Sequence, residues 1–112
     1  KSRYEAFRRG DRVPGEKLLS MIPTREETGA VYRLLRGEQR REAWNLFSMC
    51  NCLRKAKIGY DKLMISLHMM EDVGLLSFRT DGERAQIRLA KVERKADLEA
   101  SPTLQKLRRL TA

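Results

Sequence analysis

The sequence predicts one mainly α-helical domain of the α+β class, in which three helices precede a β-hairpin and a short helix ends the chain. Apolar residues recur at spacings of three and four over three segments between residues 24 and 73, which is typical of amphipathic helices. An Asp-Gly pair at 81–82 separates two short strand-like runs, the pattern of a two-residue hairpin. A length of 112 residues fits one ordinary domain.

Positive charge is the main compositional feature of the chain. Lys and Arg number 24 against 15 Asp and Glu, a formal net charge of +9, which is typical of chains that meet phosphate backbones or acidic partners. Apolar residues make up 41% of the sequence, enough to form a core. Because the chain has neither a secretory segment nor a long apolar run, we expect a soluble cytoplasmic protein without membrane contact.

The chain divides into three segments by composition. Residues 1–22 mix Gly, Pro and Arg with short apolar patches, and we expect a weakly ordered approach segment with one or two helical turns. Residues 23–90 hold the predicted three helices and hairpin. Residues 91–112 form a charged C-terminal extension with a short helix.

The first predicted helix has the clearest start signal. Thr24 is placed to cap the free amides while Glu27 reaches back to it, the capping-box pattern. Val31, Leu34 and Leu35 supply an apolar stripe. Gly37 is placed to end this helix in a left-handed conformation.

Two further helices are predicted by apolar spacing. The second runs from Glu38 to about Lys55 and is broadly buried, and the third runs from about Tyr60 to Val73, where Gly74 stops it. Apolar positions in the second are Ala43, Leu46, Phe47, Cys50 and Leu53, and in the third Tyr60, Leu63, Met64, Leu67, Met70 and Val73.

The hairpin and the last helix follow from turn and cap residues. Strands are predicted over 75–80 and 85–89, joined at Asp81-Gly82. A charged, extended stretch follows over 90–100, and Ser101-Pro102 supplies an N-cap and first-turn proline for a helix ending near Leu110. Three helices followed by a hairpin is the order of a winged helix-turn-helix, in which the hairpin is the wing.

Three short segments carry a resemblance to a known family. They are Pro-Thr-Arg-Glu-Glu at 23–27 leading to Val-Tyr-Arg-Leu-Leu at 31–35, Met-Glu-Asp-Val-Gly-Leu-Leu at 70–76, and Asp-Leu-Glu-Ala-Ser-Pro-Thr at 97–103. Over roughly residues 23–105 the chain resembles the C-terminal domain of RecJ, the single-strand-specific DNA exonuclease, of Gram-positive bacteria. The middle segment is generic to winged helices, so the specificity rests on the first and third.

The resemblance implies a setting in DNA repair and recombination, with single-stranded DNA as partner. The family's enzyme is a hydrolase that degrades single strands from the 5′ end with divalent Mn or Mg ions, using motifs rich in Asp and His. This chain has one histidine, His68, and no Asp-His-His run. We therefore expect no catalytic site, cofactor or metal here, and nuclease activity would belong to other parts of a parent protein.

The cysteines and the histidine are expected to be structural. Cys50 and Cys52 lie two apart in a helical pattern and cannot bridge, so they are predicted to be reduced thiols. Together with His68 they do not reach the ligand number or spacing of a zinc site. Cys50 is interpreted as a small core residue and His68 as a boundary residue with an ordinary hydrogen bond.

Nucleic-acid binding is predicted to use cations outside the third helix. The face opposite that helix's apolar stripe holds Asp61, Lys62, Ile65, Met69 and Asp72, which is unsuited to reading bases. A sequence-independent contact with phosphates is assigned to Arg40, Arg41, Arg54, Lys55, Lys57, Arg79, Arg84 and Arg88. Trp44, Phe78 and Tyr32 are candidates for base stacking, with a core role favoured for each.

Two other functions are compatible with the sequence. Lys62, Ile65 and Met69 could dock a repair partner or the parent's catalytic core, although packing under the N-terminal segment explains them equally well. The other alternative is a small winged-helix transcription regulator, which the acidic third helix weakens.

Overall fold

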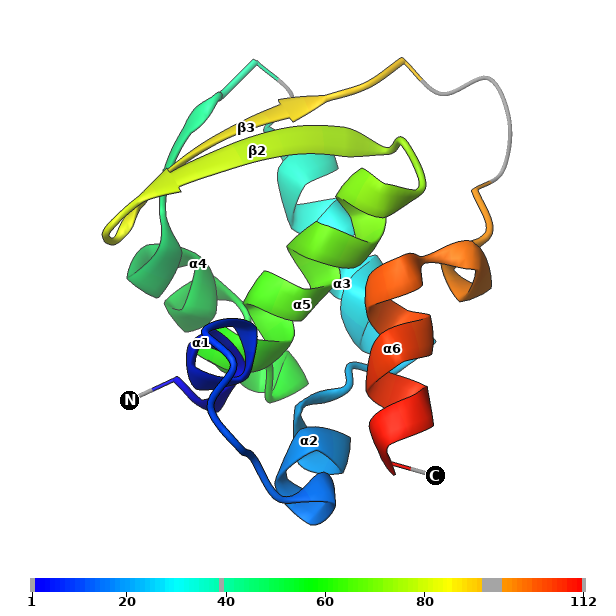
Figure 1. The fold of residues 1–112 in the computed structure, drawn as a ribbon. Helices are drawn as coiled ribbons and strands as arrows, with labels where there is room; N and C mark the ends of the chain where they lie inside the picture. Colours follow the sequence, from blue (N-terminus) through cyan, green and yellow to red (C-terminus); the bar gives the residue numbers. More distant parts are fainter. Residues whose placement is uncertain (1, 39, 92–95, 112) are drawn as a thin grey trace.

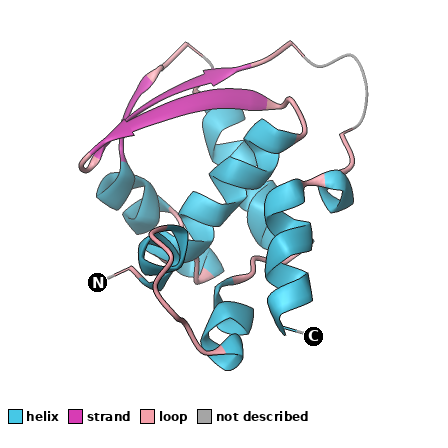
Figure 2. Cartoon of the chain, viewed as in Figure 1, coloured by secondary structure: helices cyan, strands magenta, loops and turns pink. Residues whose placement is uncertain are grey.

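The computed structural model describes residues 2–38, 40–91 and 96–111, which form a mixed α+β fold (Figure 1 and Figure 2). The described residues contain six α-helices, two 3-10 turns and one three-stranded antiparallel sheet. In chain order these are α1 (Arg3–Arg8), α2 (Gly15–Met21), α3 (Arg25–Gly37), β1 (Ala43–Asn45), α4 (Leu46–Cys52), η1 (Arg54–Ala56), α5 (Tyr60–Asp72), β2 (Leu76–Asp81), β3 (Arg84–Leu89), η2 (Leu98–Ala100) and α6 (Pro102–Thr111).

Helix α5 is the centre of the molecule. It contacts α1, α2, α3, α4, α6 and β2, and the sheet lies across one end of this helix layer (Figure 1). Its apolar residues occupy nearly the whole circumference, because Leu63, Ile65, Leu67 and Met70 are all fully buried. A helix that is apolar all round is typical of such a central position.

Helix α3 begins as predicted. The Glu27 amide donates to Thr24 Oγ1 at 3.1 Å and the Thr24 amide donates to Glu27 Oε1 at 2.8 Å, which completes the capping box. The prediction that Gly37 adopts a left-handed conformation is wrong. Among the described glycines, only Gly10, Gly74 and Gly82 have positive φ, and α3 ends with the Glu38 amide bonded to the Leu35 carbonyl at 3.2 Å.

The second predicted helix is wrong over its first half. Residues 43–45 form β1, which pairs with β3 and places Trp44 opposite Ala85, and α4 begins only at Leu46. The Asn45 side chain accepts from the Ser48 amide at 3.0 Å and so caps α4. The last predicted turn is the 3-10 segment η1. Helical spacing describes only local periodicity, whereas β1 exists because β3 supplies its hydrogen-bond partners.

The predicted hairpin and the third and last helices are confirmed. Asp81 pairs with Arg84 across a two-residue turn in which Gly82 has a φ of 61°, and the strand order is β1-β3-β2. Helix α5 spans Tyr60–Asp72, and α6 starts at Pro102 behind a buried Ser101. Residues 92–95 of the predicted extended stretch lie outside the described residues.

The N-terminal segment is more ordered than predicted. Helices α1 and α2 bury Tyr4, Leu18 and Met21 in the same core as residues of α3, α5 and the sheet. Helix α6 adds Leu104 and Leu107 to this core. The three segments distinguished by composition therefore share one hydrophobic core. Across the described ranges, we find no helix with both the length and the apolar character needed to span a bilayer.

Candidate nucleic-acid interface

The outer face of the sheet gathers three of the predicted cations. Side chains alternate across a strand, so the burial of Ala85 and Ile87 toward the core places Arg84 and Arg88 on the opposite face. Arg79 of β2 lies across from Gln86 of β3 on that same outer face. We call Arg79, Arg84, Gln86 and Arg88 the basic sheet face; all four are exposed.

The register sets the neighbours of these cations. Arg88 lies opposite Ser77, and Arg84 lies between Asp81 of β2 and Asn45 of β1. The Arg88 guanidinium also lies 3.2 Å from the carboxylate of Glu42, in an ion pair whose side chains are both more than half exposed. An exposed pair of this kind contributes little to stability, so Arg88 can exchange Glu42 for a phosphate at small cost.

Two shallow hollows lie on this face and share Arg79 and Gln86. One has a volume of about 270 Å³ and adds Ser77 and Arg88, and the other has a volume of about 620 Å³ and adds Asn45 and Arg84. The basic sheet face is therefore a gently hollowed surface lined by three guanidinium groups, by neutral hydrogen-bonding side chains and by the carboxylates of Glu42 and Asp81. The three guanidinium groups outnumber the two carboxylates, so this lining suits phosphate oxygens without reading bases.

Arg40 and Arg41 lie just before β1 in the chain. The Arg41 guanidinium lies 4.3 Å from the centre of the Trp44 ring and 3.3 Å from a Glu38 carboxylate oxygen, and its Nε donates to the Ala43 carbonyl at 3.0 Å. Arg41 is thus held in place by stacking and hydrogen bonds, whereas Arg40 is simply exposed.

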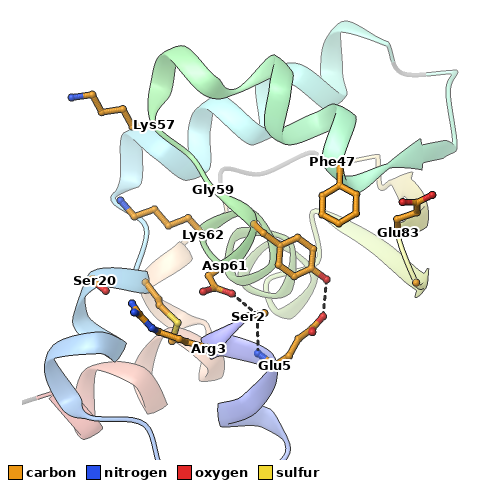
Figure 3. A pocket seen from close by; sticks show the side chains of 13 residues that line it. Ser2, Arg3, Glu5, Ser20, Phe47, Lys57, Gly59, Asp61, Lys62 and Glu83 are labelled. Carbon is orange, nitrogen blue, oxygen red and sulfur yellow. Dashed lines mark hydrogen bonds between the residues drawn. The ribbon is translucent and has the colours of Figure 1, made fainter.

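Arg54, Lys55 and Lys57 are not brought to the sheet. They lie on and after η1, where Arg54 donates to Asn51 Oδ1 at 3.1 Å and Lys57 adopts a left-handed backbone with φ of 58°. Lys57 lines a different hollow, beside α1 and the N-terminal end of α5 (Figure 3). The structure therefore divides the eight predicted phosphate-binding residues into a sheet group and an η1 group.

The prediction that Ile65 and Met69 of α5 are exposed for a protein contact is wrong. Ile65 is 0% exposed and Met69 is 2% exposed, because α1, α2 and α6 cover this side of α5. Lys62 is half-buried and lies 2.7 Å from Glu27 Oε2, so it joins α5 to the start of α3. The alternative explanation, packing under the N-terminal segment, is the one that agrees with the structure.

The core role favoured for Trp44, Phe78 and Tyr32 agrees with the structure, in which Phe78 and Tyr32 are partly buried against the core. Trp44 is buried, and Phe78 packs edge-on against His68 with ring centres 4.9 Å apart. Phe47, predicted in the buried stripe of a helix from Glu38, is instead 56% exposed, with its ring centre 6.1 Å from that of Tyr60. The start of α4 at Leu46 turns this side chain outward.

Phe47 and Tyr60 line a hollow of about 740 Å³ at the tip of the hairpin (Figure 3). The Tyr60 hydroxyl donates to Glu5 at 2.7 Å. Burial is the main cause that raises the pKa of Tyr60 to about 12, and this hydrogen bond adds to it. Asp61, which accepts a hydrogen bond from the Ser2 hydroxyl, and Glu83 add further acids to the lining. These carboxylates balance the nearby lysines, so this hollow is less suited to phosphates than the basic sheet face.

The titratable residues considered for chemistry lie apart from one another. Among the described residues no three His, Cys, Asp or Glu side chains cluster closely enough to hold a metal ion. Cys50 and Cys52 are free thiols, and burial raises the pKa of Cys50. His68 Nε2 lies 2.9 Å from the Arg8 guanidinium, an ordinary boundary hydrogen bond of the kind predicted.

Comparison of the chain with protein-family models, with curated proteins and with solved structures finds no match in any of the three.

Proposed function

We propose that this chain is a non-catalytic winged-helix domain that binds single-stranded DNA, independently of sequence, through the basic sheet face. The observation that carries the proposal is the gathering of Arg79, Arg84 and Arg88 on one exposed face of the hairpin. The element order α3-β1-α4-α5-β2-β3 and the strand order β1-β3-β2 support the winged-helix assignment, with the hairpin as its wing.

Charge and geometry both favour a contact with phosphates. Guanidinium groups form paired, charge-assisted hydrogen bonds with phosphate oxygens, and Ser77, Asn45 and Gln86 add neutral donors between them. Base reading by α5, the recognition helix of a typical winged helix, is disfavoured because α1, α2 and α6 cover it. The same cover disfavours a sequence-specific transcription regulator.

We further propose that the domain is an accessory C-terminal part of a RecJ-like bacterial exonuclease acting in repair and recombination. This proposal rests on the resemblance of the three short segments, whose residues also have structural roles in the fold. Asp72 of the middle segment accepts from the Ser101 hydroxyl of the third at 2.7 Å, and Asp97 caps η2 by accepting from the Glu99 amide at 3.0 Å. Cleavage, with Mn or Mg ions, would then belong to the parent's catalytic core.

The structure disfavours the docking of a protein partner through Lys62, Ile65 and Met69. Two of the three side chains lie in the core and the third is engaged by Glu27.

The proposal is tested by fluorescence anisotropy of the chain with a labelled oligothymidine at low salt. Replacing Arg79, Arg84 and Arg88 together by Gln is expected to weaken binding by about tenfold or more. Each lost phosphate contact reduces the number of counterions that binding releases from the DNA, and this release favours binding. The matched control replaces Arg12, Lys17 and Arg109 by Gln. It removes the same charge from the end of the molecule that holds α2, opposite the sheet (Figure 1).

The expected result is a large loss for the sheet variant and a small one for the control. Equal losses in the two variants would mean that only net charge matters, which contradicts a localised interface. Absence of binding by the unmodified chain at low salt would contradict the proposal as a whole.

A further inference from the structure

A second cationic hollow lies along α3, away from the basic sheet face. It has a volume of about 520 Å³ and its lining includes Arg25, Gly29, Tyr32, Arg33 and Arg36. These residues follow one another at spacings of three and four, with Arg33 next to Tyr32, so they form one side of the helix. We call this hollow the α3 groove.

The α3 groove is strongly positive. It is lined by three guanidinium groups and one carboxylate, that of Glu26. No ion pair within the described part of the chain includes Arg25, Arg33 or Arg36. Hydrogen bonding to Arg108 is the main cause that lowers the pKa of Glu99, and the charge of Arg25 adds to it. Both carboxylate oxygens of Glu99 are hydrogen-bonded to Arg108.

Gly29 is unusual because it stands in the interior of a 13-residue helix. A glycine there costs about 1 kcal/mol relative to alanine. Its backbone does not require glycine, since its φ is not positive, and an added Cβ would approach only the mobile end of the Arg33 side chain, at 3.3 Å. Gly29 therefore leaves space in the groove that the Arg33 guanidinium occupies.

Tyr32 supplies a flat surface beside these cations. Its ring is half-buried, and the Arg36 guanidinium lies over the ring, 5.9 Å from its centre. A base stacked on this face of the ring would take the place of the guanidinium and leave it to a neighbouring phosphate. An aromatic ring next to a guanidinium is the usual support for an unstacked base, with the phosphates on either side bound by further cations.

We propose that the α3 groove binds one unstacked base of single-stranded DNA on Tyr32, with Arg25, Arg33 and Arg36 on the neighbouring phosphates. This inference rests on the proposed function and adds the origin of strand selectivity. The basic sheet face contacts only phosphates, which single strands and duplexes both present. A base held in a duplex cannot reach Tyr32, so the α3 groove favours single strands.

The experiment measures the affinity ratio between an oligothymidine and a duplex of equal length. Tyr32→Leu removes the stacking surface, and Gly29→Ala places a methyl group against the Arg33 guanidinium in the groove while favouring the helix. Each is expected to lower single-strand affinity by about tenfold and to leave duplex affinity unchanged. Phe47→Leu is the matched control, because it removes an exposed aromatic ring outside the groove and is expected to leave the ratio unchanged.

Folding is checked by the Tm, which Gly29→Ala is expected to preserve or raise. An unchanged affinity ratio in both groove variants would overturn the inference, as would a ratio lowered by Phe47→Leu but not by Tyr32→Leu. In either case the response of the Arg79, Arg84 and Arg88 variant would still decide the proposed function separately.

Discussion

His68 lies on α5 between the rings of Tyr4 and Phe78, whose centres are 5.6 Å and 4.9 Å from its own. Its Nε2 lies 2.9 Å from the Arg8 guanidinium, which can only donate, so Nε2 is an acceptor and the ring is neutral. Burial is the main cause that lowers the pKa of His68, and the Arg8 charge adds to it, while Glu71 and Asp72 oppose both. This single side chain therefore couples the N-terminal helix to α5 in a pH-dependent way.

We predict that the free energy of unfolding is lower at a pH of about 5.5 than at about 7.5, two values on either side of the pKa of an unfolded histidine. An unfolded histidine titrates near a pKa of about 6.5. Because the folded pKa is lower, the unfolded state binds more protons between the two values, so acid favours unfolding in that window. The carboxylates whose pKa values are lowered, such as Asp72 and Glu27, titrate below it.

Urea denaturation at the two pH values measures this effect. His68→Asn, which cannot take up a proton, is expected to show a much smaller change in unfolding free energy. Equal pH dependence in the variant and the unmodified chain would rule out His68 as the source.

Helices and strands whose signals lie within a few residues were predictable from the sequence. Thr24 with Glu27, and Asp81 with Gly82, act locally and appear in the structure as expected. Strand β1 depends on pairing with β3, about forty residues along the chain, so no local pattern could reveal it. The burial of Ile65 and Met69 likewise depends on helices remote in sequence.

The candidate site shows the same division. Strand alternation predicts that Arg84 and Arg88 share a face, and the hairpin register adds Arg79. The separation of Arg54 and Lys57 from that face could not be predicted, because it depends on where α4 and η1 end. The α3 groove could not be predicted for a related reason. Its cations lie along the exposed side of α3, and nothing in the sequence indicates which other residues lie beside that side.

Met69 is predicted to affect only the stability of the fold. Met69→Ala leaves a cavity beneath α1, α2 and α6 and is expected to lower the free energy of unfolding by about 2–5 kcal/mol. Leu19→Ala is the control, because Leu19 is 60% exposed on α2 and its truncation is expected to change stability little. Chemical denaturation compares the two, and a Met69→Ala chain as stable as the unmodified one would contradict the burial of this side chain.

The whole molecule combines a single core with charge placed on selected surfaces. Helices α1, α2 and α6 complete the core around α5 and leave the sheet as the open face of the wing. The proposed DNA contact therefore uses strands and the side of α3, while α5 serves as the structural axis. This arrangement suits the proposed contact with a single strand, which does not depend on sequence.

Salt dependence of oligothymidine binding tests the central claim most directly. For single strands, the logarithm of the association constant falls with the logarithm of salt concentration by about 0.7 per phosphate contact. If Arg79, Arg84 and Arg88 each contact one phosphate, replacing all three by Gln makes this slope shallower by about 2. An unchanged slope in that variant would contradict the assignment of the basic sheet face as the DNA interface.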